Sequence, residues 1–372
     1  MEGGPRCATR EPAAAFRPLA GTSPASSRKV PSLRPRLASL LVAAAGLAAA
    51  GALPALAQDA GKPVLTVYTY ESFLPDWGPG PKIEAAFETT CGCDLQWVGL
   101  GDGVAILNRL KLEGAATKAD VALGMTAELV PEMKRTGFFA PSGVDLATLK
   151  VPGGWSDDTF VPFDYSYLAF VYDSESVKNP PKSLDDLVNG DPEEKIAIED
   201  PRNSTPGLGF LLWMKAVYGD KAPEKWRTLS KRILTVTPGW SEAYGLFTSG
   251  EVPMVLSYTT SPAYHEIEEK TERYKAAAFS EGHYLQVELA GRLAGSKHPE
   301  LAEAFLRFLV SPEAQGILPT TNWAYPVTEP ATPLPAAFGK LVQPSKPLAV
   351  DAAAVEANRR AWTDEWLRAI GR

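Results

Sequence analysis

The stretch that decides the fold is Phe160-Val-Pro-Phe-Asp-Tyr-Ser-Tyr-Leu-Ala-Phe-Val-Tyr172, a long aromatic run of β-prone residues. Strands and helices are expected to alternate on both sides of this run, and the run itself interrupts that alternation. A second β-prone run, residues 279–288, closes the region that follows. We interpret the two runs as crossing segments that carry the chain from one domain to another and back.

The region before the first crossing predicts alternating strands and helices. The expected strands are 64–70, 94–98 and 119–124, and the expected helices are 81–88 and 104–113. This β-α-β-α-β order predicts a parallel sheet, and ligands of open α/β sheets gather at the carboxyl ends of the strands. Tyr70 and Trp77 follow the first strand and are candidates for one wall of a site. Packing of Trp77 under its own loop is the alternative.

The loop Gly99-Leu-Gly-Asp-Gly103 leads into the second helix and fits neither a dinucleotide nor a P-loop motif. Asp102 is placed as the N-cap of that helix, and Gly114 as the residue that ends it. A cap at a strand-to-helix loop can also present its carboxylate, or the amide of Gly103, to a ligand. Both interpretations of Asp102 stay open.

A second helix start lies in the region between the crossings. A short strand is expected at 195–198, followed by Glu199-Asp-Pro-Arg-Asn-Ser-Thr-Pro-Gly-Leu-Gly209 and a helix at 210–217. Ser204 or Thr205 before Pro206 fits an N-cap with proline at the first helical position. Helix starts bind anions through their free N–H groups, so a phosphate on a ligand is expected here. A plain cap is the alternative.

Aromatic rings and hydroxyls concentrate in Gly239-Trp-Ser-Glu-Ala-Tyr-Gly245 and Leu256-Ser-Tyr-Thr-Thr-Ser-Pro-Ala-Tyr-His265. These segments predict a glycine-rich turn and a short apolar strand at 252–256. The mixture suits a small organic ligand, because rings offer flat contact area and a negative face for a cation while hydroxyls fix its orientation. The alternative is that Trp240 and Tyr258 are ordinary core aromatics.

Length and charge narrow the class of protein. The chain has 372 residues, enough for two domains, with 45% hydrophobic and 22% charged residues. Its net charge is −7, and since residues 1–57 contribute +5, the remainder carries −12. An acidic body argues against nucleic acid or an anionic membrane as the main partner and is compatible with a cationic ligand. The three histidines are not spaced as a metal pair, so no metal site is expected.

Residues 1–57 are interpreted as an export leader. Arg34 and Arg36 precede an apolar, alanine-rich run at 37–53, and Ala55-Leu-Ala57 is a small-residue cleavage site. A membrane anchor is the alternative. Cleavage after Ala57 leaves Cys91 and Cys93 in an oxidising compartment, where they form a local disulfide, remain free thiols or have a redox role. We favour a local structural bridge.

The chain resembles the solute-binding proteins of ABC importers, whose common segment Ser-Pro-Glu-Ala-Gln stands here at 311–315. More specific motifs, spread over the whole mature chain, resemble the periplasmic thiamine-binding group of that family. These motifs are Leu65-Thr-Val-Tyr-Thr-Tyr-Glu-Ser-Phe73, Asp76-Trp-Gly-Pro-Gly-Pro81, residues 200–209, 239–245 and 256–265 quoted above, and Asn322-Trp323.

The resemblance implies an α/β fold of the two-lobed periplasmic binding protein type (type II-like), with each lobe a sheet flanked by helices. Lobe 1 would comprise residues 58–165 and 288–372, and lobe 2 residues 166–287. It also implies a periplasmic monomer, without cofactor or catalysis, that binds thiamine or its mono- and diphosphate and delivers it to a membrane permease. Closure on the ligand would be a hinge motion about the two crossings.

The resemblance further implies which residues contact the ligand. Aromatic walls are expected from Tyr70, Trp77, Trp240, Tyr258 and Trp323, and polar contacts from Asp102, Gly103, Ser204, Thr205, Thr259, Thr260 and Ser261. Glu71 stands where many relatives have Asp, so we do not assign it a direct contact. Alternatives are a polyamine or ferric ion on the same fold, or a secreted thiamine-modifying enzyme. The sequence has no G-x-S-x-G or H-E-x-x-H motif to support an enzyme.

Overall fold

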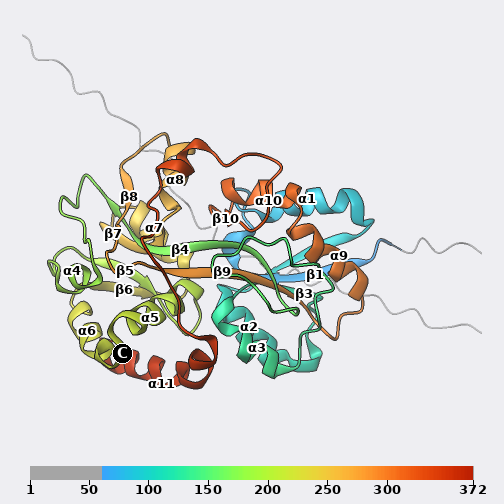
Figure 1. Ribbon diagram of the computed structural model, residues 1–372, viewed down its shortest axis with the longest axis horizontal. Coiled ribbons are helices and arrows are strands. Elements are labelled where there is room, and N and C mark those ends of the chain that lie inside the picture. The colour runs from blue at the N-terminus through green and yellow to red at the C-terminus, as the bar shows by residue number, and fades with distance from the viewer. Residues whose placement is uncertain (1–60, 372) are drawn as a thin grey trace, which may run out of the picture. The chain divides into compact units, whose positions relative to one another are not determined.

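The computed structural model describes residues 61–371. The predicted leader, with Cys7 and the cleavage site after Ala57, lies outside these residues. The main strand path runs in the order β2-β1-β3-β9-β4-β7-β5-β6, with β8 and β10 paired to β4 and β11 to β9 (Figure 1). In chain order the strands are β1 (Val64–Thr69), β2 (Asp94–Gly99), β3 (Val121–Thr126), β4 (Val161–Asp173), β5 (Ile196–Glu199), β6 (Ile233–Thr237), β7 (Met254–Tyr258), β8 (Tyr274–Ala276), β9 (His283–Arg292), β10 (Tyr325–Pro326) and β11 (Pro347–Leu348).

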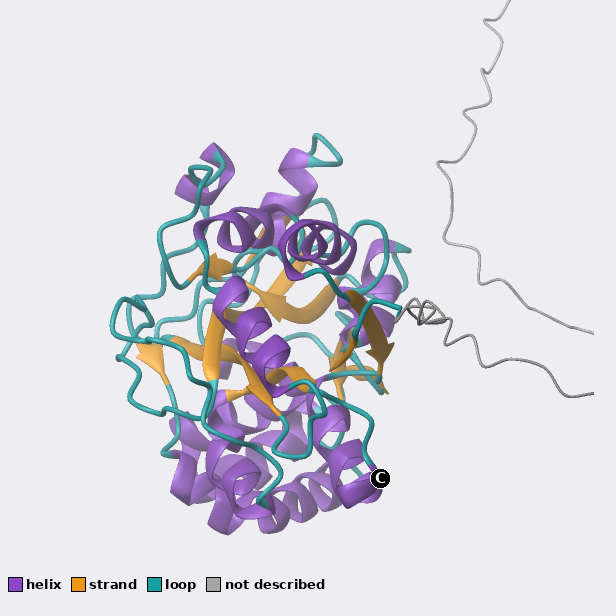
Figure 2. Cartoon of the chain, turned by 90° about the vertical axis from the view of Figure 1, so that its right-hand side faces the viewer, coloured by secondary structure: helices purple, strands orange, loops and turns teal. Residues whose placement is uncertain are grey.

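Helices lie above and below the strands (Figure 2). The helices are α1 (Gly80–Cys91), α2 (Gly103–Glu113), α3 (Val130–Thr136), α4 (Leu184–Asn189), α5 (Thr205–Tyr218), α6 (Ala222–Leu229), α7 (Trp240–Thr248), α8 (Ser261–Ile267), α9 (Pro299–Leu309), α10 (Pro312–Ile317) and α11 (Ala352–Ile370). None of the helices within residues 61–371 combines the length and the apolar composition needed to cross a membrane.

β4 joins two groups of strands. Its first part pairs antiparallel with β9, from Val161 to Tyr167, and its second part pairs antiparallel with β7, from Leu168 to Tyr172. One group is therefore β2-β1-β3-β9 and the other β7-β5-β6, with β4 passing between them. The first crossing is confirmed. The return strand β9 begins only at His283, because Gly282 adopts a positive φ of 100° in the preceding turn.

The first group contains the parallel pairs that its alternation of strands and helices predicts, and the second group, for which no pairing was predicted, is parallel too. β1 pairs parallel with β2 and β3, and β5 pairs parallel with β6 and β7. The predicted helix starts are also confirmed. Asp102 caps α2, and the Ser204 hydroxyl caps α5 by accepting from the amide of Gly207 at 3.2 Å. These caps hold the first turns of both helices in place.

The segment expected to be a glycine-rich turn is instead the helix α7, and that expectation was wrong. Gly239 is its N-cap, and Ala243, Tyr244 and Phe247 are buried on one side of it. The helix packs on β5 and β7. Burial of an apolar stripe at helical spacing outweighs the low helix propensity of the glycine at 245.

The helix α11 contacts both groups of elements. Arg359 pairs with Glu132 of α3 at 2.5 Å, whereas Glu365 pairs with Lys215 of α5 at 2.6 Å. Trp366 also meets Trp226 of α6, with ring centroids 6.3 Å apart. The predicted lobe boundaries at 165/166 and 287/288 stay a prediction, because contacts group the described residues 61–371 into one unit.

Candidate functional site

The ends of parallel strands from both groups supply the candidate site. Tyr70 follows β1, Asp102 follows β2, Glu199 ends β5 and Tyr258 ends β7. This is the strand edge at which open α/β sheets bind ligands. Burial raises the pKa of the Tyr258 hydroxyl well above its usual value, and the carboxylates of Glu288, Asp102 and Glu199 raise it further. Tyr258 therefore lies among acidic side chains from both groups of strands.

Asp102 connects the N-terminal ends of α2, α5 and α7. Its Oδ1 accepts from the amide of Gly103 at 2.6 Å and from the hydroxyl of Thr205 at 3.1 Å. Its Oδ2 accepts from the amide of Trp240 at 3.3 Å. Burial raises the pKa of the Asp102 carboxyl, while these donors act in the opposite direction. Asp102 is therefore both the expected cap and a bridge between the two strand groups.

Close packing at this bridge depends on two glycines. A Cβ on Gly103 would lie 2.2 Å from the carbonyl oxygen of Gly124 and 2.5 Å from Cγ2 of Thr205. Gly124 has a positive φ of 103°, and a Cβ there would lie 2.2 Å from Cδ1 of Tyr70. The absence of side chains at both positions lets α2 approach α5 and lets the Tyr70 ring lie against β3.

A hydrogen-bonded network joins the two crossing strands to the loop that follows α10. Asp164 on β4 lies directly opposite Glu288 on β9. The Tyr70 hydroxyl lies 2.9 Å from Oε2 of Glu288 and 3.1 Å from Oδ1 of Asn322. Nδ2 of Asn322 donates to Oδ2 of Asp164 at 2.6 Å. The Tyr70 hydroxyl is thus fixed by Glu288 of β9 and, through Asn322, connected to β4, which gives a predicted aromatic wall a defined position.

Trp240 has a rigid support. Its ring stacks on Tyr244 with centroids 4.6 Å apart, and its Nε1 donates to the hydroxyl of Ser257 at 2.9 Å. The Ser257 hydroxyl lies 2.8 Å from that of Ser261. The Tyr244 hydroxyl lies 2.7 Å from Nε2 of the buried His265. These contacts hold the indole in one orientation, as a wall that recognises a flat ligand requires.

Several buried polar atoms beside Tyr258 have no protein partner. The hydroxyls of Thr259 and Thr260 make no hydrogen bond, although both residues are fully buried. Gln286 donates through Nε2 to the Tyr258 hydroxyl at 2.9 Å, whereas its Oε1 has no partner. Unpaired buried polar atoms are costly, so they mark places where a ligand or water completes the hydrogen bonding.

The site gathers carboxyl groups that have no basic partner among the described residues. Asp102, Asp164, Glu199 and Glu288 take part in no ion pair within residues 61–371. Both carboxyl oxygens of Glu199 and Oδ1 of Asp164 are buried without a partner. Buried carboxylates are normally paired, so this arrangement favours a cationic ligand. The described residues contain no cluster suited to a metal ion.

Sequence reasoning missed Asp164, Glu199, Gln286 and Glu288 as site residues. Asp164 and Glu288 stand in the two aromatic and aliphatic runs that we interpreted as crossings. Asp164 is almost fully buried, and a carboxylate inside such a run is seldom buried without a purpose, so its presence there was a usable signal. For Glu199 the signal was its place at the end of a strand that leads to a capped helix.

Two of the predicted aromatic walls lie outside this network. Trp77 is 42% exposed in the loop before α1. Trp323 has a positive φ of 56° and meets Tyr264 edge-on, with centroids 5.4 Å apart. Neither indole makes a hydrogen bond to another described residue. Both stay predictions as ligand contacts, whereas the neighbouring Asn322 belongs to the network.

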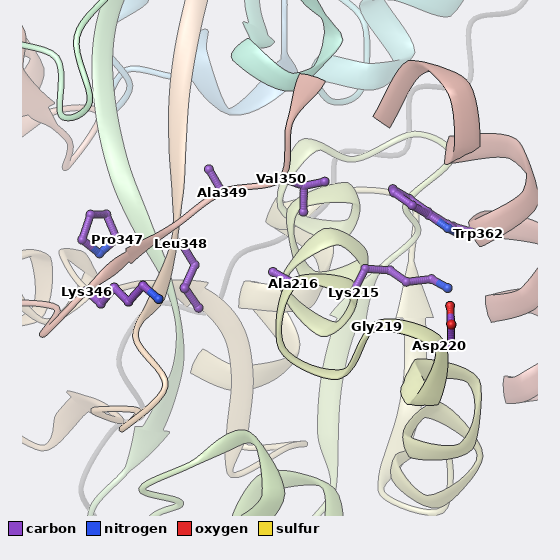
Figure 3. Close-up of a pocket in the computed structure, with 10 residues that line it drawn as sticks. All are labelled: Lys215, Ala216, Gly219, Asp220, Lys346, Pro347, Leu348, Ala349, Val350 and Trp362. Carbon is purple, nitrogen blue, oxygen red and sulfur yellow. The ribbon is translucent and has the colours of Figure 1, made fainter. Parts of the chain in front are cut away.

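A hollow of about 510 Å³ lies elsewhere, and none of the predicted site residues lines it (Figure 3). Its lining residues are Lys215, Ala216, Gly219, Asp220, Lys346, Pro347, Leu348, Ala349, Val350 and Trp362. Lys215 is paired with Glu365 at 2.6 Å and lies 5.4 Å from the centre of the Trp362 ring. Because the charge of Lys215 is already balanced by Glu365, this hollow is a weaker candidate for binding a charged ligand than the strand ends are.

The two cysteines of the described chain are joined. Cys91 ends α1 and Cys93 precedes β2, and a disulfide links them with Cα atoms 5.2 Å apart. Cys93 is fully buried in the core. The bridge lies at the junction of a helix and a strand, away from the hydrogen-bonded network of the site.

Comparison with known proteins identifies close relatives. The family model described as bacterial extracellular solute-binding protein matches residues 116–345. The chain is 58% identical over 312 residues to the thiamine-binding periplasmic protein of Brucella suis biovar 1 (strain 1330), covering 84% of this chain and 93% of the relative.

Solved structures agree with this comparison. A periplasmic thiamin binding protein superimposes with a TM-score of 0.82 at 58% identity, covering 84% of this chain and 97% of that one. Iron-bound HitA from Pseudomonas aeruginosa superimposes with a TM-score of 0.67 at 21% identity, covering 83% of this chain and all of that one, and this likeness shows the fold alone. The fold is the mixed α/β fold of two-lobed periplasmic binding proteins.

Proposed function

The chain belongs to the bacterial extracellular solute-binding proteins, and from this membership we propose that it captures thiamine and delivers it to the membrane permease of an ABC importer. The family consists of binding proteins rather than enzymes, so no chemical step is assigned to the site. Thiamine is the cargo, and we propose no cofactor.

The observation that carries the proposal is the set of unpaired buried carboxyls beside an aromatic wall. Thiamine has a permanently cationic thiazolium ring joined to a flat aminopyrimidine. Asp164 and Glu199 have buried oxygens without partners, and the Trp240 indole is held by Ser257 while its amide donates to Asp102 of the same site. A cation over an indole gains about 0.5–2 kcal/mol, and pairing with a desolvated carboxylate adds to that.

Polar groups of the site suit the uncharged parts of the ligand. The unpaired hydroxyls of Thr259 and Thr260 and the free Oε1 of Gln286 offer donors and acceptors to the aminopyrimidine and the hydroxyethyl arm. The amino group of an aminopyrimidine needs hydrogen-bond acceptors, and an alcohol can use either donors or acceptors. Binding would therefore remove the cost of leaving these atoms without partners.

We propose that the mono- and diphosphate of thiamine bind as well. Support comes from α5, a helix of 14 residues whose N-terminal end carries Ser204 and Thr205. Free N–H groups and the positive end of the helix dipole favour a phosphate there. In the present arrangement Asp102 accepts from Thr205, so a phosphate would have to share or replace that contact.

Delivery requires that the site open and close. Asp102 belongs to one strand group, while Thr205 and Trp240, which donate to it, belong to the other. We propose that the described structure is the closed form and that opening breaks these bonds by a hinge motion at β4 and β9. We also propose that the protein is exported, cleaved after Ala57, and acts as a periplasmic monomer.

A ligand panel tests the proposal. Purified mature chain, unfolded and refolded to remove carried-over ligand, is dialysed against labelled thiamine with unlabelled competitors. Thiamine and its two phosphates are expected to displace the label, whereas spermidine and ferric ion at the same excess are not. No retention of labelled thiamine, together with retention of spermidine or ferric ion when either is labelled in the same dialysis, would move the assignment to another ligand of the same fold.

A further inference from the structure

Two carboxyls face each other at the point where the crossing strands meet. Asp164 on β4 and Glu288 on β9 are directly opposed in the antiparallel register. Side chains at such positions lie on the same face of the sheet, with Cβ atoms about 5 Å apart. Asp164 is 1% exposed. The two carboxyls are connected through Asn322, which donates to Asp164, and Tyr70, whose hydroxyl lies 2.9 Å from Glu288.

The surroundings of the pair supply no positive charge. Within residues 61–371 neither carboxyl forms an ion pair, and the other titratable groups that act on them are Tyr70, Asp102 and Tyr258. Each of these is neutral or negative. Oδ1 of Asp164 and Oε1 of Gln286, both on residues 1% exposed, have no partner. The pair therefore has hydrogen-bonding and charge capacity that no other part of the described protein uses, and that a bound cation could use.

Two opposed carboxyls without a cation retain a proton to a higher pH than isolated ones do. Burial raises the pKa of Asp164 to about 7. Burial and the neighbouring Asp164 carboxylate raise the pKa of Glu288 well above its usual value. Since the groups interact, the proton belongs to the pair rather than to either residue. In the described arrangement, burial and mutual opposition thus favour a shared proton on this pair near neutral pH when no cation lies beside it.

We propose that capture of the cationic ligand is coupled to release of a proton from the Asp164–Glu288 pair. This inference rests on the proposed function, because it takes the ligand to be thiamine. The O–H bond of the carboxylic acid breaks, the proton passes to the solvent, and the thiazolium charge takes its place beside the resulting carboxylate. No electrons are transferred, and the net charge of the pocket with its ligand is unchanged by the exchange.

Proton release makes affinity depend on pH in a defined direction. Where the empty pair is protonated and the occupied pair is not, the dissociation constant for thiamine falls by up to about tenfold for each unit of rising pH. The dependence levels off once the empty pair is itself ionised. A solute taken up near neutral pH would therefore be held less tightly in acidic surroundings.

Calorimetry of wild-type protein tests this directly. Thiamine is titrated into the refolded mature chain at about pH 7 in several buffers of different ionisation enthalpy, and the slope of the binding enthalpy gives the protons exchanged. We expect a net release of up to one proton for each thiamine bound. Binding with no exchange, or with uptake, overturns the inference while leaving the proposed function intact. Absence of thiamine binding under all conditions overturns the proposed function.

Variants locate the proton. Glu288→Gln and Asp164→Asn are expected to bind thiamine more weakly and to lose the proton release, whereas Glu329→Gln, whose side chain is 84% exposed, should behave as the wild type does. Release that persists in both variants of the pair contradicts the assignment. Infrared difference spectra of wild-type protein provide a readout that needs no variant. Loss of the protonated carboxyl band on binding supports the inference, and an unchanged band opposes it.

Discussion

The carboxylate of Asp102 accepts a hydrogen bond from the hydroxyl of Thr205 at 3.1 Å, between residues 103 positions apart in the chain. Asp102 caps α2, and Thr205 is the first residue of α5 in the other strand group. The same carboxylate accepts from the amide of Trp240 at the start of α7. One side chain thus stabilises a helix start and holds the two halves of the site together.

Replacement of Asp102 by alanine tests this double role. Loss of the cap is expected to lower the free energy of unfolding by about 0.5–2 kcal/mol. Loss of the bridge is expected to weaken thiamine binding by tenfold or more, because closure no longer gains the bonds from Thr205 and Trp240. Denaturant unfolding and calorimetry measure the two effects. Asp351→Ala removes the cap of α11, where Asp351 accepts from Ala354 at 2.9 Å, and should lower stability but not affinity.

Replacement of Gly103 by alanine tests whether the closed form needs close packing. The new Cβ would lie 2.2 Å from the carbonyl oxygen of Gly124, so α2 and α5 cannot approach as they do. We expect a folded protein that binds thiamine at least tenfold more weakly and shows no ligand-induced compaction in solution scattering. Gly245→Ala is the matched control, since its Cβ meets nothing within 4 Å. Wild-type affinity and compaction in Gly103→Ala would contradict the closed arrangement.

The Asp164 carboxyl should lower the stability of the empty protein above acidic pH. Its pKa is about 7 in the folded state, against about 3.9 when unfolded, so stability falls as pH rises between these values. Asp164→Asn removes this cost. The ligand-free variant is expected to be more stable than wild type at about pH 8, on the order of a few kcal/mol, and to approach it below about pH 4. Equal stability of wild type and variant at both pH values would show that burial does not disfavour the ionised form of this carboxyl.

His283 should stay neutral until the protein unfolds in acid. Burial lowers its pKa, its Nε2 accepts from the amide of Phe279 at 3.1 Å, and its Nδ1 lies 2.7 Å from the carbonyl of Leu168. Because the unfolded chain binds a proton near the usual pKa of about 6.5, stability falls as pH drops through that value. NMR of the His283 ring should show one neutral tautomer from about pH 7.5 to about pH 6. A titration with an ordinary midpoint would contradict this.

Short-range sequence patterns, such as helix caps and β-prone runs, allowed much of the fold to be predicted. Asp102, Gly114 and Ser204 act on the residues next to them, so their roles as helix boundaries follow from short-range hydrogen bonding. The strands of the first parallel group, β5 and β7 of the second, and the first crossing follow from β-prone runs, whereas β6 was not predicted. The helix α7 was missed because its stability comes from burial of Tyr244 and Phe247 rather than from local propensity.

The acidic part of the site could not be predicted in the same way. The bond between Tyr70 and Glu288 joins residues 218 positions apart, and no local pattern indicates it. The opposition of Asp164 and Glu288 depends on a strand register that only the assembled sheet defines. The aromatic and hydroxyl positions came from local patterns and from the resemblance. Neither shows which buried atoms lack a hydrogen-bond partner.

The central claim, that the site binds thiamine against the wall formed by Trp240, is tested most directly by tryptophan fluorescence. The refolded, ligand-free mature chain is titrated with thiamine and then with each phosphate. We predict a saturable change at sub-micromolar thiamine that Trp240→Ala abolishes and that Trp362→Phe, on the distant helix α11, retains. A flat signal with all three compounds, while circular dichroism shows a folded protein, would contradict the account.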